Sequence, residues 1–597
     1  MRQSISNYPR SARWLVFLFA VSFFFYQSDA WAQQSARTDI TLLVDSHLES
    51  GEFPAAIALA NSLDRDQRNR QLARISKKQM NSGAANAAFK TAGMVNYDSD
   101  RANILAELSQ QRSGYAPASD GQSQQPSGQA GGITEADFND LIELIQNTIK
   151  PDSWADTGQG LGTIQAYPAG VFVDASGTLR KIKIDRASKA TLIRDRARRD
   201  SGNRETSSQS DLRMVSVTRL EKAAQLLAAQ GKPVSHSMRN LAGIYQVKYL
   251  MVYPETGDIV IAGPAGPWKL DDDRRPINIE TGKPVLQLDD LVVCLRNAWE
   301  NNGKFGCSIT PRKKNLATTK KFLADTNLKG KRWSKAIRET LGKQDIKVFG
   351  IDSQTHAARV LVEADYRMKL VGMGLEESVK NVPSYLDRLR LTADGKAPPM
   401  DVVRWWFTLN YEDIVSDEDK TTFTFNGTGV KVLSENEFID EQGERIHTGK
   451  SNDPTSGFAR DFTKHFDKLA DKYPVYRQLK NVCDMALVAS LIRQQELNRK
   501  TQWHRTFFGS PKSNGGLTYQ VSKDVAATQV DSVLNEKILR FKKASSTVKH
   551  HLVGVSGGIS CDMSQVIDSE FSKDDGKLAA TAKQSKPDLA STNWWWD

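Results

Sequence analysis

The sequence predicts a multidomain α+β protein with an N-terminal all-helical, repeat-like module, a small helix-plus-strands unit and a large mixed α+β domain. Three observations lead to this prediction. The 597 residues are too many for a single hydrophobic core. Apolar residues at helical spacing give way, beyond a polar linker, to segments with strand-like alternation. Strands and helices then follow one another irregularly, which favours an α+β domain over a doubly wound sheet.

The N-terminus, residues 1–32, is typical of a secretory signal peptide. Three arginines flank the start of an apolar run over residues 14–26, which is shorter than the roughly 20 residues that span a bilayer as a helix. Small residues at Ala30 and Ala32 predict cleavage near Ala32. We therefore expect an exported protein, in the periplasm or outside the cell, with no transmembrane span in the mature chain. An uncleaved anchor is the alternative.

The chain is basic, with a formal net charge of +11. The signal segment carries three basic residues and one acid, so its removal leaves +9. Basic proteins often bind nucleic acid, but an exported protein rarely meets it, and we expect no nucleic-acid partner. An anionic envelope polymer or membrane headgroups are better candidate partners for the basic residues between Arg312 and Arg332, and a plain solvated face is favoured over both.

Residues 33–112 form the predicted helical module, because apolar residues recur there at helical spacing. Arg68 and Leu72 also recur 33 residues later as Arg101 and Leu105. A period of this length in helix pairs is typical of tetratricopeptide-like repeats, although two copies are fewer than the three or so usually needed. The module is either a docking surface for a protein partner or a packed helical cap.

Three shorter segments follow the helical module. Residues 113–133 are rich in Gly, Ser, Gln and Pro and predict a flexible linker. Residues 134–185 predict a small α/β module, in which a helix precedes strands Thr163–Tyr167 and Gly170–Asp174. Residues 186–211 are basic and poor in apolar residues, which predicts a second linker.

Residues 212–564 form the predicted large α+β domain of unknown function. We expect helices over 217–229, 286–299, 314–324, 333–341, 458–469 and 476–494, and strands over 245–252, 258–262, 346–350, 358–370, 402–411, 421–425 and 429–433. The polar segment 565–597 predicts a disordered tail that ends in a tryptophan cluster, Trp594–Trp596. Exposed tryptophans favour an interface, so this cluster is a second candidate surface for a protein partner.

Two polar strand faces hold the candidate site residues. In the predicted strand Val362–Leu370, alternation places four charged residues on one face: Glu363, Asp365, Arg367 and Lys369. The two carboxylates could form an acid–base pair. However, Arg367 would hold Asp365 ionised, so a solvated, self-neutralising face is the favoured interpretation.

The second face belongs to the strand that contains Trp406. Val403, Trp405 and Phe407 form an apolar row there, and Arg404 and Trp406 face the other way. Trp406 could stack on a sugar ring or on an aromatic side chain of a partner, but a half-buried sheet position is the favoured interpretation.

Neither nucleophile nor cofactor motifs are convincing in this sequence. Gly554-Val-Ser-Gly-Gly558 resembles the surroundings of a chymotrypsin-type nucleophile, but no histidine has the matching context, and a strand that needs glycines explains it as well. We expect no cofactor and no metal site. Cys294, Cys307, Cys483 and Cys561 could pair in three ways in an oxidising compartment, or remain buried thiols.

Six long motifs of the large domain lie within about 212–560: Leu212–Glu221, Tyr253–Ala265, Pro284–Leu291, Val362–Leu370, Arg404–Phe407 and Tyr473–Leu479. These motifs resemble an uncharacterised exported family of planctomycete bacteria, a domain of unknown function. Leu144–Trp154 is separately similar to a short module of other planctomycete envelope proteins. The resemblance implies a compartment and a lineage but no catalytic residue.

Together, these features predict an exported cell-envelope protein with a non-enzymatic binding or scaffolding role. The alternative is a hydrolase acting on envelope polysaccharide, with Glu363 and Asp365 as the acid–base pair and Trp406 as a sugar platform.

Overall fold

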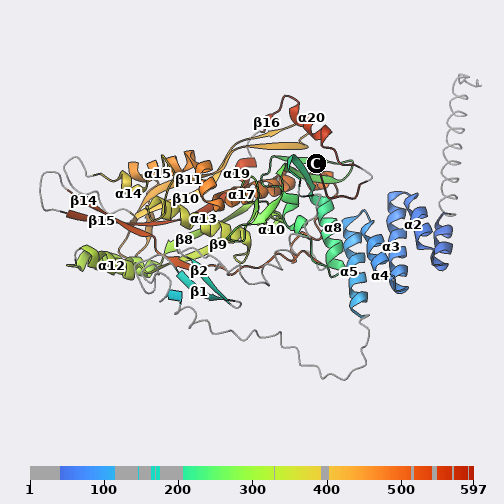
Figure 1. The fold of residues 1–597 in the computed structure, drawn as a ribbon, viewed down its shortest axis with the longest axis horizontal. Coiled ribbons are helices and arrows are strands. Elements are labelled where there is room, and N and C mark those ends of the chain that lie inside the picture. Colours follow the sequence, from blue (N-terminus) through green and yellow to red (C-terminus); the bar gives the residue numbers. More distant parts are fainter. Residues whose placement is uncertain are drawn as a thin grey trace, which may run out of the picture. The chain divides into compact units, whose positions relative to one another are not determined.

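The fold is described from a computed structural model of the chain (Figure 1), which describes residues 40–114, 145–146, 163–167, 170–174, 206, 208–328, 330–390, 402–511, 517–540, 548–567, 571–588 and 591–597. The predicted signal peptide, and most of the linkers and of the 134–185 module, lie outside these residues. Within the described part, no helix has the length and apolar character needed to cross a membrane. The chain divides into two compact units.

The first unit contains the predicted helical module, drawn in blue in Figure 1. Its helices are residues 40–49, α2 (Phe53–Asn61), α3 (Arg65–Asn81), α4 (Ala85–Gly93) and α5 (Asp98–Gly114). The starts of α3 and α5 are 33 residues apart, which matches the repeat seen in the sequence. The helical prediction for this region is therefore confirmed.

The first unit has its own hydrophobic core. The repeat-related residues Leu72 and Leu105 are both fully buried in it. Residues 222–233, from the C-terminal part of α8 (Val217–Ala229) onward, belong to the same unit and add Ala229 to the core. Arg101 is also buried and donates hydrogen bonds to Asp98, Gln225 and the carbonyl oxygen of Val95. A buried guanidinium needs such partners to offset its desolvation.

The second unit is built on a mixed 13-stranded sheet. Its path runs β13 (Gln529–Asp531), β9 (Lys343–Phe349), β8 (Lys304–Pro311), β15 (Val548–Asp562), β10 (Val402–Ser416), β11 (Thr422–Ile439), β4 (Tyr249–Tyr253), β5 (Asp258–Ala265), β3 (Ser210–Ser216) and β17 (Trp595–Trp596). Off this path, β12 (Arg445–His447) pairs with β11, β14 (Leu534–Arg540) with β15, and β16 (Ser572–Lys573) with β10. The two small sheets are β1 (Thr163–Tyr167) with β2 (Gly170–Asp174), and β6 (Trp268–Leu270) with β7 (Pro276–Asn278).

Helices of the second unit cover the sheet and one another. The remaining helices are α9 (His236–Arg239), α10 (Leu288–Glu300), α11 (Lys313–Asp325), α12 (Gly330–Leu341), α13 (His356–Gly372), α14 (Tyr385–Arg388), α15 (Asp453–Lys464), α16 (Phe466–Lys472), α17 (Pro474–Gln494), α18 (Leu497–Lys500), α19 (Ser564–Ile567) and α20 (Lys577–Gln584). α13 contacts β8, β10 and β15, while α15, α16 and α17 contact β11 (Figure 1). The mixed α+β prediction is confirmed.

The centre of this core is the apolar row of β10. Trp405 and Phe407 are fully buried, and Trp405 stacks on Phe458 with ring centroids 4.5 Å apart. The Trp405 indole N–H donates to the carbonyl oxygen of Thr455, which satisfies its one polar group. The predicted alternation of β10 is confirmed, since Arg404 and Trp406 are only half-buried on the opposite face.

The prediction of a strand over 358–370 is wrong, because this segment lies within helix α13. Thr355 caps the helix, its hydroxyl accepting a hydrogen bond from the Ala358 N–H. Nearly every side chain from Ala357 to Gly372 is buried. A helix buried all round lacks the polar stripe that reveals helical period, so its alternating residues imitate a strand.

The prediction of a disordered tail over 565–597 is also wrong for the described part. β16, α20 and β17 occupy this segment, and β17 pairs antiparallel with β3. Trp596 packs beside Met214 and Met251. The large sheet thus includes β3, which begins at Ser210, and β17, which ends one residue before the last.

Candidate functional site

Glu363 and Arg367, two of the four predicted site residues, lie on α13 and take part in ion pairs. Glu363 accepts a hydrogen bond from Arg275 at 3.0 Å and lies 3.7 Å from Arg367, one helical turn away. Arg367 also donates to Glu376 at 2.7 Å and stacks over the Tyr473 ring. The Glu363 carboxylate is therefore held between two guanidinium groups.

Asp365 forms a fully buried pair with Lys369. The Lys369 Nζ donates to the Asp365 carboxylate at 2.6 Å, and neither side chain has any exposed surface. Burial raises the pKa of Asp365 and lowers the pKa of Lys369, since each charge loses its hydration. Cys307 lies nearby, and burial together with the Asp365 charge raises the pKa of its thiol. A pair with no solvent access has the character of a structural contact rather than an acid–base couple.

Trp406 does not join these residues. It projects from the face of β10 opposite Trp405, whereas α13 packs on the Trp405 face, where Gly372 lies against the Trp405 ring. The Arg404 guanidinium covers the Trp406 ring at 4.4 Å from its centroid. The four predicted site residues thus lie on both sides of one sheet and form no common cleft.

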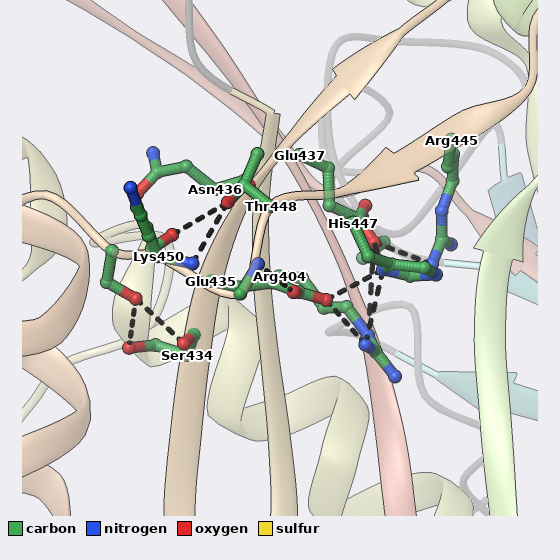
Figure 2. A network of polar contacts seen from close by, with 12 residues as sticks. Arg404, Ser434, Glu435, Asn436, Glu437, Arg445, His447, Thr448 and Lys450 are labelled. Carbon is green, nitrogen blue, oxygen red and sulfur yellow. Dashed lines mark hydrogen bonds and ion pairs between the residues drawn. The ribbon is translucent and has the colours of Figure 1, made fainter.

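Figure 2 shows a charged network that sequence reasoning missed. It lies on the Trp406 side of the sheet, because its Arg404 covers the Trp406 ring. Arg404 donates to Glu435 at 2.6 Å, and Arg445 donates to Glu437 at 2.9 Å. His447 Nδ1 lies 2.7 Å from the Glu435 carboxylate and 2.9 Å from that of Glu437. We call Arg404, Glu435, Glu437, Arg445 and His447 the hairpin network.

Strand register brings the hairpin network together. Arg404 on β10 lies opposite Glu435 on β11, and Glu437 lies opposite His447 on β12. Glu435 and Glu437 are two residues apart on one strand, so both carboxylates project from the same face. The turn between β11 and β12 is anchored, since Gly443 lies against the backbone of α11.

The carboxylates of the hairpin network are buried but well satisfied. The second oxygen of Glu435 accepts a hydrogen bond from the Gly449 N–H at 3.2 Å. The second oxygen of Glu437 accepts one from the Ser556 hydroxyl, also at 3.2 Å. Burial opposes ionisation of Glu435, but hydrogen bonds from Arg404 and His447 outweigh it and lower the pKa of that carboxyl.

The hairpin network also contains a set of potential metal ligands. One oxygen each from Glu435 and Glu437, and one ring nitrogen of His447, all lie within 4.8 Å of one another. This is the single such group of three or more among the residues that the structure describes. The sequence analysis did not single out this group, although Glu435 and Glu437, two residues apart and followed by His447, are a pattern that could have indicated it.

The motif Gly554–Gly558 has a structural role in β15. The Ser556 hydroxyl hydrogen-bonds Glu437 rather than a histidine. Gly557 lies where a β-carbon would overlap the Trp405 carbonyl oxygen and approach Lys369 Cε at 3.0 Å. Gly557 therefore permits close packing of β15 against β10 and α13, in line with the expectation that the glycines serve the strand.

The four cysteines are free thiols, all buried in the second unit. Cys294 donates to the carbonyl oxygen of Val482 at 3.6 Å. The Cys561 thiol has a hydrogen bond with Cys483, which raises its pKa together with burial. The raised pKa values of Cys294, Cys307 and Cys561 disfavour thiolate chemistry, so these three side chains act as small core residues.

Some of the basic residues between Arg312 and Arg332 form ion pairs with acidic neighbours, and others are exposed. Arg312 pairs with Asp345 at 2.9 Å, and Lys313 pairs with Glu444. Lys314 and Lys321 on α11 are exposed. Because these ion pairs neutralise part of the positive charge, the electrostatic field at this surface is weaker than the number of basic residues indicates.

Comparison with known proteins gives one match. Residues 307–385 match a family described as Protein of unknown function (DUF1598). This segment runs from β8 through α11, α12, β9 and α13 to Tyr385, so it holds the Asp365–Lys369 pair but not the hairpin network. No curated protein and no solved structure matches the chain. The predicted domain of unknown function is thus supported for this segment, and the match assigns no reaction.

Proposed function

We propose that the protein is an exported, non-enzymatic binding or scaffolding protein of the cell envelope. The observation that carries this proposal is the pairing of both candidate catalytic carboxylates with cations. Glu363 is held by Arg275 and Arg367, and Asp365 by Lys369. A general acid or base must exchange its proton with a bound substrate. Asp365 has no exposed surface and Glu363 has 8%, which favours binding over hydrolysis.

Export is supported by residues 1–32, whose basic start, short apolar run and small residues before Gln33 are typical of a signal peptide. The resemblance of the large domain to exported planctomycete proteins agrees with this. The four cysteines are buried free thiols, which are compatible with both an oxidising and a reducing compartment.

A protein partner is proposed to bind the helical module. In its first helix, Val44 and Leu48 are buried, whereas Leu42 and Leu43 are 61% and 51% exposed. Single exposed leucines are ordinary, but two adjacent ones at the end of a helical repeat offer an apolar contact surface. The Trp594–Trp596 cluster is a weaker candidate, since its side chains are half-buried against the chain itself. Exposed lysines of α11 favour an anionic envelope polymer as a second, weaker partner.

The test is capture of the partner from envelope extract by the full chain. Leu42→Glu/Leu43→Glu changes the exposed leucines without touching the buried core, and Glu49→Gln on the same helix is the matched control. We expect a partner retained by the unmodified protein and the control, and lost by the double variant with unchanged circular dichroism. A partner set that does not change in the double variant would remove the docking role of the module.

A further inference from the structure

The hairpin network contains three side chains whose potential ligand atoms all lie within 4.8 Å of one another (Figure 2). Glu435 and Glu437 come from β11, and His447 comes from β12, directly opposite Glu437. We propose that Glu435, Glu437 and His447 bind a divalent transition-metal cation of the zinc class. This site is independent of the partner surface proposed above.

The potential ligand atoms lie close enough together to be drawn onto a single ion. His447 Nδ1 lies 2.7 Å and 2.9 Å from the Oε1 atoms of the two glutamates. Zinc binds nitrogen and carboxylate oxygen at about 2.0–2.2 Å, so neighbouring ligands in one coordination shell lie roughly 3 Å apart. One imidazole with two carboxylates is a mixed nitrogen and oxygen set, which suits zinc better than calcium or magnesium.

The remaining carboxylate oxygens are fixed by neutral donors. The Gly449 N–H holds Oε2 of Glu435, and the Ser556 hydroxyl holds Oε2 of Glu437. Each glutamate therefore keeps its Oε1 directed toward His447. Second contacts that orient ligands in this way are a general feature of metal sites and raise their affinity.

The site is open on one side. The Glu437 side chain is fully buried and that of Glu435 is 6% exposed, but the His447 side chain is 52% exposed. An ion can therefore enter from the His447 side, and solvent can supply the remaining ligands. A bound ion would tie β12 to β11 and so stabilise the hairpin.

Two arginines set the strength of the proposed site. Arg404 and Arg445 each donate to one of the glutamates, so they balance the two carboxylate charges when no metal is bound. A dication then adds positive charge beside them, which lowers affinity. Removal of Arg404, which lies outside the ligand set, should therefore tighten metal binding.

Equilibrium dialysis of the full chain against zinc, with metal content measured by mass spectrometry, tests the proposal. We expect one site that His447→Gln weakens more than about tenfold. His47→Gln is the matched control, because His47 pairs with the single carboxylate of Glu52 at 2.7 Å in the first unit. Its zinc binding should equal that of the unmodified protein.

Arg404→Gln separates a metal site from a plain ion-pair network. We expect it to tighten zinc binding by roughly tenfold, and zinc to raise the unfolding temperature of the unmodified chain but not of His447→Gln. The proposal is overturned if His447→Gln binds zinc as the unmodified chain does. Unchanged or weaker binding by Arg404→Gln would overturn it as well, because the carboxylates would then serve the arginines alone.

Discussion

Asp365, which the sequence paired with Glu363 as a candidate acid–base couple, forms a structural ion pair with Lys369 in the fold. They are one helical turn apart on α13, 2.6 Å apart at their charged atoms, and fully buried. Burying two charges costs free energy that their mutual attraction offsets only in good geometry. The pair lies in the segment that matches the family of unknown function. Its expected role is therefore to fix α13 against the sheet.

Lys369→Met should destabilise the second unit by about 3 kcal/mol, because it leaves the Asp365 carboxyl buried without a partner. Asp365→Leu/Lys369→Met removes both charges and should recover most of that loss. Urea unfolding followed by circular dichroism measures both values. Equal destabilisation in the single and double variants would contradict a paired role for these residues.

Gly557 is a second position where one atom decides the packing. An alanine β-carbon there would overlap the Trp405 carbonyl oxygen, so Gly557→Ala should cost about 3 kcal/mol. The control is Gly554→Ala in the same strand, whose β-carbon would meet only Leu534 at 3.2 Å and should cost about 1 kcal/mol or less. Thermal unfolding compares the two. Similar unfolding temperatures for both variants would argue against the close approach of β10 and β15.

At the scale of elements, the sequence predicted correctly the strands and helices that have one buried face. It was wrong for elements that are buried on every side, and for elements that are held in place by residues distant in the sequence. β10 alternates between buried and half-buried residues, and its period was readable. α13 is buried on nearly every side and imitated a strand. The C-terminal segment is polar, and what orders it is distant: Arg213 pairs with Asp597, 384 residues away.

Removal of residues 593–597 tests whether β17 is a docked strand. It takes away the ion pair of Asp597 with Arg213 and the stacking of Trp595 on the same guanidinium. We expect a loss of about 2 kcal/mol, below the range for a fully buried pair because Asp597 is 39% exposed. Urea unfolding gives the value, with the exposed Thr592→Ala as control. An unchanged midpoint would support the disorder that the sequence predicts.

The candidate site was only half readable from the sequence. Trp406 and Arg404 were correctly placed on one polar face of β10. The partners of Arg404 lie 31 and 33 residues further on, and only the register of β10, β11 and β12 brings Glu435, Glu437 and His447 beside it. Register depends on contacts across strands, which a single sequence does not display.

For the whole molecule, the division into two units has a thermodynamic consequence. The first unit has its own core, which includes Leu105, and should unfold separately from the second. We expect two transitions in calorimetry. Leu105→Ala should lower the free energy of unfolding of the first unit by about 3 kcal/mol and leave that of the second unit unchanged. A single transition that shifts as a whole in this variant would mean that the two units unfold together.

Export is the claim on which the proposed envelope role depends most. The direct measurement is the intact mass and location of the protein in fractionated cells that produce the full chain. We expect it outside the cytoplasm, with an N-terminus at Gln33 and a mass lower by that of residues 1–32. A full-length chain that stays in the cytoplasmic fraction would contradict the proposal.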